Sequence, residues 1–307
     1  MKRMKIIRRE GAIFLTVCLL ACLMASGCAT TKKISYDIMG KGRALKKKVA
    51  FLGTINRSGY GGTEFADAAS IQLKSSLKAY GNGLVLVDSR NLRKAMEQVP
   101  RSSSGQIDTL ALAKVGKKYG LNAVLEQSIE GIQGVTEKRG IWGFRHTCFL
   151  TRLSMRIVAY DVETATILYN QMFQRTVEVS EEEWQGIKKG NRYEKGVANR
   201  LLAKMIPDIR KNISRRLGNE PWKGYICAVS DDTFTLAAGK DVGLAEGDIL
   251  EVFGAGEPIR GTGGGIYLIP GQKIGEIKIT KVLRSRAEAT AISGHDLERS
   301  GCVRLKR

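Results

Sequence analysis

The feature that most constrains this chain is an uncharged apolar segment close to its start. Five basic residues lie within the first nine positions, and an apolar segment from Gly11 to Ala25 follows without any charge. A positive region before a short apolar segment is the pattern of a secretory signal. The segment is shorter than the roughly 20 apolar residues that a membrane-spanning helix needs, and it lacks the polar face of a buried amphipathic helix. The sequence therefore predicts that residues 1–27 are a signal peptide.

The apolar segment ends in Ala25-Ser26-Gly27-Cys28, which resembles the bacterial lipobox, in which small residues precede the cysteine that receives lipid. A second candidate, Leu19-Leu20-Ala21-Cys22, lies inside the segment. Cys28 is preferred because it leaves a longer apolar segment with two small residues before the cysteine. A thioether-linked diacylglycerol plus an amide-linked chain gives at least two anchors, which makes attachment stable. The alternative is an ordinary cleaved signal that leaves Cys28 as a free thiol.

The chain stays strongly basic after the predicted signal is removed. Its net charge is +20, and residues 1–27 contain five basic residues and one acid, so the mature chain carries +16. In the cytosol such a charge would indicate nucleic acid, but export excludes that partner. The polyanions of an envelope are phospholipid head groups, lipopolysaccharide phosphates and acidic wall polymers. A basic surface that only keeps the protein soluble explains the charge equally well.

Cysteine usage argues against a disulfide framework. If Cys28 is acylated, the mature chain has Cys148, Cys227 and Cys302, an odd number at wide spacing with no Cys-x-x-Cys. Cys227 and Cys302 are the pair that could bridge, because both belong to the strand-rich C-terminal region. Three buried, unpaired cysteines are the favoured interpretation.

The mature chain divides into a tether, an α/β region and a β region. Residues 28–45 are polar and basic and predict the tether. Residues 46–218 predict an α/β domain from their hydrophobic periods, and Pro207 predicts a kink or a break in its last helix. The predicted strands are 49–52, 84–87, 123–132, 147–160 and 167–177, and the predicted helices are 65–80, 89–98, a helix ending at Gly120, and 197–217.

A basic and aromatic segment joins two of the long predicted strands. Its residues are Lys138, Arg139, Trp142, Phe144, Arg145 and His146. Aromatic rings beside long cationic side chains suit a surface that touches lipid head groups or a partner. We therefore predict a docking tip here. The acidic cluster Glu181–Glu183 predicts the start of a polar stretch further along the chain.

Gly218–Pro221 marks a predicted boundary, after which the chain is rich in glycine and has no clear helical period. Residues 222–307 predict a small all-β domain, a barrel or a sandwich. The fold class is therefore α+β. Its predicted strands are 225–229, 233–236, 249–253, 274–282, 287–292 and 303–305.

The sequence predicts no catalytic site, no metal site and no cofactor. The loop Gly59–Thr63 lies between a strand and a helix but lacks the spacing of a dinucleotide or P-loop motif, and a permissive turn explains its glycines. Gly261–Gly265 is interpreted as a flexible hairpin tip. His146 and His295 lie far apart without a nucleophile motif. Asp161 and Glu163 are interpreted as turn residues.

Four segments resemble, in the family's order, the curli secretion-channel (CsgG-like) lipoprotein family. They are 49–59, 84–92, 119–125 and 160–167. The resemblance covers about residues 46–178 and implies an α/β domain like the N-terminal part of TolB, which lipoprotein activators of penicillin-binding proteins share. The segment from Gly224 to Ile277 resembles the C-terminal barrel of the flagellar assembly protein FlgT.

The signal and the resemblance together imply an outer-membrane lipoprotein, lipid-anchored and facing the periplasm, with the inner membrane as an open alternative. We expect a non-catalytic scaffold or accessory factor for secretion, for a surface organelle such as curli or a flagellum, or for cell-wall synthesis. Envelope proteins and a second copy of the chain are the expected protein partners. The alternative is a CsgG-type oligomeric secretion-channel subunit. An envelope hydrolase is disfavoured, because no nucleophile–base pair appears.

Overall fold

The computed structural model describes residues 44–190, 193–262 and 265–306. The predicted signal peptide, Cys22, Cys28 and the tether up to residue 43 lie outside the described residues. Residues Leu45–Lys306 belong to one compact unit. The elements before residue 219 are β1 (Lys47–Asn56), α3 (Gly62–Tyr80), β2 (Leu84–Leu86), α4 (Arg90–Glu97), α5 (Thr109–Lys118), β3 (Ala123–Arg139), β4 (His146–Asp161), β5 (Ile167–Glu178), α6 (Glu181–Lys189) and α7 (Lys195–Gly218).

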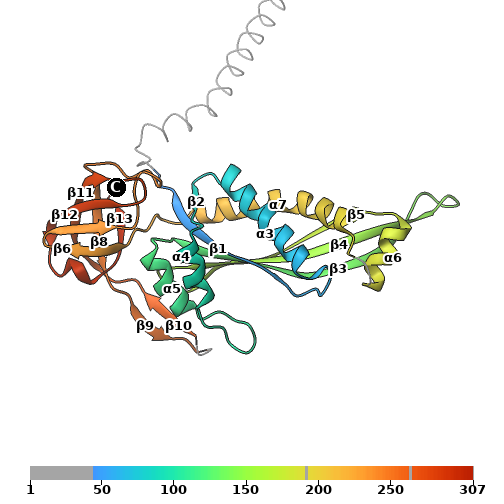
Figure 1. Ribbon diagram of the computed structural model, residues 1–307, viewed down its shortest axis with the longest axis horizontal. Coiled ribbons are helices and arrows are strands. Elements are labelled where there is room, and N and C mark those ends of the chain that lie inside the picture. Colours follow the sequence, from blue (N-terminus) through green and yellow to red (C-terminus); the bar gives the residue numbers. More distant parts are fainter. Residues whose placement is uncertain (1–43, 191–192, 263–264, 307) are drawn as a thin grey trace, which may run out of the picture. The chain divides into compact units, whose positions relative to one another are not determined.

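A five-stranded sheet organises this first part, with the strand order β2-β1-β3-β4-β5. β1 runs parallel to β2 and β3, whereas β3, β4 and β5 are antiparallel neighbours. Successive side chains of a strand point to opposite faces of the sheet. Val49 and Phe51 of β1 therefore join the core under α3 and α7, and Ala50 joins the core under α4 and α5. Helices therefore cover both faces of the sheet, as Figure 1 shows.

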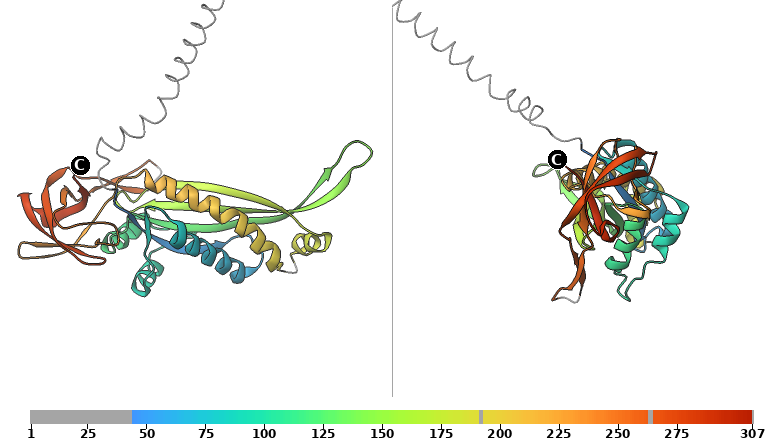
Figure 2. Two further views of the ribbon diagram at one scale, coloured as in Figure 1. Left: turned by 90° about the horizontal axis from the view of Figure 1, so that it is seen from above. Right: turned by 90° about the vertical axis from the view of Figure 1, so that its left-hand side faces the viewer.

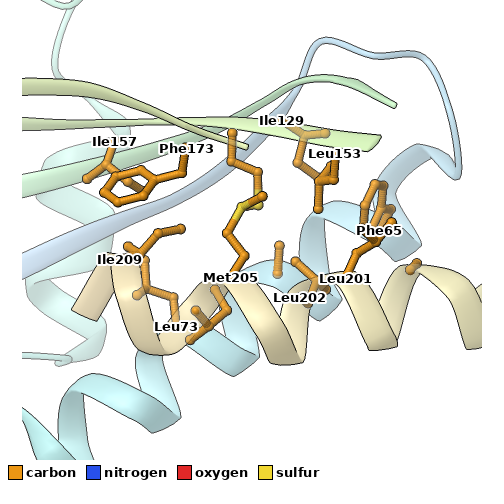
Figure 3. Close-up of a cluster of buried hydrophobic side chains, with 14 of the residues drawn as sticks. Phe65, Leu73, Ile129, Leu153, Ile157, Phe173, Leu201, Leu202, Met205 and Ile209 are labelled. Atoms are coloured by element: carbon orange, nitrogen blue, oxygen red, sulfur yellow. The ribbon is translucent and has the colours of Figure 1, made fainter. Parts of the chain in front are cut away.

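The larger core lies between the sheet and helices α3 and α7 (Figure 3). Leu73 of α3 and Leu201, Met205 and Ile209 of α7 are fully buried there against Ile157 and its sheet neighbours. Burying each such side chain stabilises the fold by about 1.5–3 kcal/mol. The prediction that Pro207 could break the last helix was wrong, because α7 is a single 24-residue helix with Pro207 inside. The burial of residues on both sides of the proline accounts for this.

The remaining elements form a second, curled sheet and a separate two-stranded ribbon. The six-stranded sheet has the order β13-β8-β11-β12-β7-β6. An isolated bridge pairs Gly224, which lies just before β6, with Val303 of β13, so the two edges of the sheet approach each other. The bounds are β6 (Ile226–Ser230), β7 (Thr233–Leu236), β8 (Ile249–Gly254), β9 (Glu257–Arg260), β10 (Ile266–Ile269), β11 (Lys273–Val282), β12 (Ala287–Gly294), a short 3-10 helix (Leu297–Arg299) and β13 (Ser300–Leu305).

The structure therefore confirms the α+β class, and it also corrects several local predictions. Glu181–Glu183 do not open a polar stretch but begin helix α6, because Ser180 and Glu183 form a reciprocal capping box. β3 continues to Arg139 and does not end near residue 132, since it pairs with β4 as far as His146. Strands β9 and β10 were not predicted, but their antiparallel pairing on either side of Gly261–Gly265 agrees with the predicted hairpin.

The predicted tether ends at a residue that the structure shows to be buried, which corrects its boundary. Leu45 is 3% exposed and packs into the core of the curled sheet. Lys48 is also buried, and its ammonium group donates to the carbonyl oxygen of Ala237 at 2.8 Å. Burial lowers the pKa of Lys48, although the carboxylate of Asp241 acts in the opposite direction. The first residues of β1 thus fasten the five-stranded sheet to the C-terminal sheet.

Candidate functional site

The β3–β4 hairpin extends beyond the rest of the five-stranded sheet, as Figures 1 and 2 show. The last pair between β4 and β5 is Leu150 with Glu178. Beyond it, four pairs from Thr136–Phe149 to Arg139–His146 continue as a two-stranded ribbon. Isolated hairpins are marginally stable in water, so the ribbon depends on support at its base.

Helix α6 supplies that support. Trp184 is buried, and its ring centroid lies 5.3 Å from that of Phe149 on β4. A side chain at Gly134 of β3 would bring a Cβ to 2.8 Å from Nε1 of Trp184, so the indole packs directly on the backbone of the ribbon's base. The ammonium group of Lys188 lies 4.6 Å from the Trp184 ring on the same helix.

Ion pairs hold the end of the ribbon. The Arg139 guanidinium lies 2.9 Å from Oε2 of Glu137 and 3.3 Å from Oε2 of Glu178. The hydrogen bond to Glu137, and then its charge, raise the pKa of Arg139 further above its ordinary value. Exposed pairs of this kind contribute little to stability, but they link the projecting ribbon to the end of β5.

Two glycines shape the turn at the end of the ribbon. Gly140 has φ 118° and Gly143 has φ 92°, values that favour glycine. A Cβ at Gly140 would lie 2.3 Å from the carbonyl oxygen of Phe144. The N–H of Phe144 donates to the carbonyl oxygen of Ile141 at 2.9 Å. The turn is therefore tight, and its own backbone closes it.

The turn exposes three large apolar side chains to solvent. Ile141 is 79% exposed, Trp142 is 92% exposed and Phe144 is 82% exposed, and no other large apolar side chain in the described ranges exceeds 64%. The structure brings Lys138, Arg139, Trp142, Phe144 and Arg145 together on this tip, all exposed. Sequence reasoning missed Ile141, although it lies directly beside Trp142. We call residues 138–146 the tip.

The glycine-rich loop before α3 is occupied by the protein's own aromatic rings. Gly61 caps α3 with φ 69°, and a Cβ there would lie 2.6 Å from the Tyr193 ring. Tyr60 is buried, and its hydroxyl accepts a hydrogen bond from the N–H of Glu194 at 2.6 Å. Packing and turn geometry therefore explain these glycines, in agreement with the turn that the sequence predicts.

A buried group of charged side chains lies where the two sheets meet. Nζ of Lys223 lies 2.7 Å from Oδ1 of Asp161 and 3.0 Å from Oε2 of Glu163. Arg304 donates to Oε1 of Glu163 at 2.7 Å. Oδ2 of Asp161 also accepts hydrogen bonds from the N–H and the hydroxyl of Thr164, so its predicted role in the turn is confirmed.

Cys302 belongs to the same buried group. Its thiol donates to Oε1 of Glu163 at 3.0 Å, an arrangement of thiol and carboxylate that sequence reasoning missed because 139 positions separate the two residues. Burial, together with the charge and hydrogen bond of Glu163, raises the pKa of the thiol to about 12. Reactive cysteines need a lowered pKa, so this thiol stays protonated and unreactive at neutral pH. All three cysteines are free thiols, as expected, but only Cys148 and Cys302 are buried. The expectation that Cys227 is buried was wrong, because its side chain is exposed on β6.

The remaining candidate residues do not converge. His146 lies at the start of β4 and His295 follows β12, and both are exposed. Among the described residues, no group of three or more His, Cys, Asp or Glu side chains is placed to hold a metal ion. Within the same ranges, no helix combines the length and the apolar character needed to span a membrane.

Comparisons with known proteins give structural neighbours only. No protein-family model and no curated protein matches the chain. The chain is similar to hypothetical protein CT253 from Chlamydia trachomatis, with a TM-score of 0.35 and 14% identity, over 57% of this chain and 100% of the other. It is similar to the LpoB C-terminal domain from Salmonella enterica, with a TM-score of 0.30 and 18% identity, over 46% of this chain and 91% of the other. It is also similar to lipoprotein GNA1162 from Neisseria meningitidis, with a TM-score of 0.30 and 10% identity, over 55% of this chain and 99% of the other.

Proposed function

We propose that this protein is a non-catalytic, lipid-anchored scaffold or accessory factor of the bacterial cell envelope, which uses the tip to dock on another envelope component. The exposed tip carries the proposal. A soluble protein rarely exposes a contiguous apolar patch unless the patch contacts something. Ile141, Trp142 and Phe144 are neighbours on one tight turn that two glycines shape, and all three are largely exposed.

The anchoring part of the proposal rests on the N-terminal sequence. The basic region, the uncharged segment and Ala25-Ser26-Gly27-Cys28 support export and acylation, with Cys22 as the second candidate. We place the anchor in the outer membrane with the body facing the periplasm. The finer likenesses, a CsgG- and TolB-like domain at 46–218 and a FlgT-like domain at 222–307, belong to the same proposal. They favour an assembly role in secretion, in a surface organelle or in wall synthesis.

A secretion-channel subunit is the second candidate, and the dimensions of the ribbon speak against it. Only four residue pairs project beyond β5. At about 3.3 Å per residue they extend roughly 13 Å, and a bilayer core is about 30 Å thick. The segment that follows β5 is not an extended hairpin either, because Glu181–Lys189 form helix α6.

The anchor is tested by acyl labelling of the full-length protein and of two matched variants. Cys28→Ala should abolish labelling and leave the precursor unprocessed or outside the membrane fraction. Cys22→Ala should label and fractionate like the unchanged protein. Labelling that persists in Cys28→Ala and disappears in Cys22→Ala would move the anchor to Cys22. If neither the unchanged protein nor the Cys22→Ala variant were labelled, the lipoprotein proposal would be overturned.

A further inference from the structure

The tip concentrates apolar exposure to a degree that the rest of the described chain does not approach. Its three large apolar side chains are 79–92% exposed, whereas the next most exposed, Ile71 and Tyr80 of α3, are both 64% exposed. Ile71 and Tyr80 lie on a helix whose other face is buried, but the tip projects past α6 into solvent (Figure 2). The exposed apolar side chains are therefore confined to the turn at the end of the hairpin and are not spread over a flat surface.

These side chains project from a turn whose backbone is tightly defined. The hydrogen bond from the N–H of Phe144 to the carbonyl oxygen of Ile141 closes the turn. Close approach of the Gly140 backbone to the carbonyl of Phe144 leaves no room for a Cβ at position 140. Arg139 also pairs with Glu137 on the same strand and with Glu178 at the end of β5. The exposed side chains thus project from a turn with a defined backbone.

The chemistry of the turn combines aromatic rings with positive charge. Lys138 and Arg145 flank the apolar residues, and both are exposed. Tryptophan is enriched at the level of lipid head groups, where one part of the ring is wet and the other apolar. Long basic side chains bind anionic lipid phosphates while their stems lie along apolar surface. A short apolar point with a basic rim matches the interface of an anionic bilayer.

We propose that the tip inserts Ile141, Trp142 and Phe144 into the head-group region of an anionic membrane leaflet, with Lys138 and Arg145 bound to lipid phosphates. This inference rests on the proposed export of the protein and specifies what its tip docks on. The insertion is shallow, because only the turn is apolar and the ribbon below it carries charged side chains. The tip is a second membrane contact, separate from the acyl anchor.

The three tryptophans of the chain make a sharp test possible. Trp142 is 92% exposed, whereas Trp184 and Trp222 are 8% and 7% exposed. Full-length lipoprotein is reconstituted in vesicles of phosphatidylethanolamine and phosphatidylglycerol, with either ordinary or brominated acyl chains. We expect the brominated lipid to quench part of the tryptophan fluorescence, and Trp142→Phe to remove that quenching while the emission of the two buried tryptophans remains. Ile71→Ser is the matched control for an exposed apolar residue and should leave the quenching unchanged.

A second experiment tests how insertion of the tip depends on its basic residues and on the charge of the lipid. Each basic contact to an anionic surface is worth about fivefold in binding, so Lys138→Gln and Arg145→Gln should each lower the ratio of inserted to free tip about fivefold. Brominated vesicles of phosphatidylcholine alone, which carry no net charge, should quench the fluorescence of Trp142 less than the anionic vesicles do. Both effects should shrink at high salt.

The outcomes separate this inference from the proposed function. Co-flotation with vesicles but equal fluorescence in ordinary and brominated lipid would overturn membrane insertion and leave the lipoprotein proposal standing. Failure to co-float would overturn the lipoprotein proposal itself. A blue shift of Trp142 that appears only on adding an envelope protein fraction, with no quenching by brominated lipid, would overturn the inference in favour of a protein partner.

Discussion

Nζ of Lys223 lies 2.7 Å from Oδ1 of Asp161, and each side chain is only 7% exposed. Asp161 is the last residue of β4, and Lys223 lies just before the C-terminal sheet. The pair therefore joins the two sheets where little water can enter. Removing one member of a buried ion pair leaves the other charge unpaired, which costs far more than the intact pair contributes.

Lys223→Met is expected to lower the free energy of unfolding by about 3–5 kcal/mol. Methionine keeps much of the side-chain volume but leaves Asp161 and Glu163 buried without the ammonium group. The matched control is Lys281→Met, because Lys281 is 59% exposed and lies 3.6 Å from Glu288. An exposed pair contributes about 1 kcal/mol or less. Urea unfolding of both variants followed by circular dichroism measures the difference, and equal losses would show that the Lys223 cluster has no special structural role.

The same cluster predicts how stability depends on pH. Burial alone would raise the pKa of Glu163, but the Lys223 charge, hydrogen bonds from Cys302 and Lys223, and the Arg304 charge together lower it below 4.5. Burial alone would lower the pKa of Lys223, but Asp161 and Glu163 outweigh burial and raise it above 10.5. Glu163 thus stabilises the fold above its ordinary pKa, and this stability is lost as the pH falls through the folded-state pKa. Lys223 stabilises below its ordinary pKa, and that stability is lost as the pH rises through the folded-state value.

We therefore expect the contribution of the cluster to be constant between about pH 5 and pH 10 and to fall at both ends. Urea midpoints measured from well below pH 5 to above pH 10 check the prediction. Glu163→Gln should be less stable at neutral pH and should show a shallower loss in acid than the unchanged protein. An acid limb of equal steepness in both proteins would place the titrating group elsewhere.

The elements that sequence patterns predicted are those whose signals are local. Gly81 closes α3, and the Ser89 side chain caps α4 by accepting from the N–H of Leu92, so the predicted helices 65–80 and 89–98 end and begin at local signals. Helix α6 was missed because only Trp184 and Ile187 of its nine residues are buried, so its hydrophobic period is weak. Ser180 and Glu183 nevertheless carried a readable capping-box signal.

In the candidate site, too, the sequence indicated features carried by neighbouring residues and missed contacts between distant ones. The basic and aromatic residues of the tip are neighbours in the sequence, so composition alone located them. The support beneath them depends on Trp184 packing on Phe149, a contact between residues far apart in the chain. Lys223 and Cys302 approach Glu163 only because the C-terminal sheet packs on the end of β4, and no local pattern encodes that contact.

Residues 222–307 are expected to fold alone as an all-β unit. The curled sheet encloses a core that includes Trp222, Leu250 and Ile277, to which Leu45 also contributes. The fragment would expose Lys223 and Cys302, which the intact protein buries against the α/β region, so its unfolding temperature should lie below that of the full protein. Circular dichroism of the fragment should show a β spectrum and a cooperative melt. Substantial helix or a random-chain spectrum would contradict an independent C-terminal domain.

The last prediction concerns conductance. A hairpin that crosses a bilayer must bring an alternating apolar face of about ten residues per strand to the lipid. The ribbon beyond β5 has only four residue pairs, and its end carries Lys138, Arg139 and Arg145. A basic side chain on the lipid face costs about 2–4 kcal/mol at the bilayer midplane, so several of them oppose full insertion while permitting contact with head groups. Purified lipoprotein added to planar bilayers is therefore expected to be electrically silent, with a bacterial porin in the same chamber as the positive control. Reproducible conductance steps that vanish on deleting residues 136–146 would instead show that the hairpin forms part of a channel.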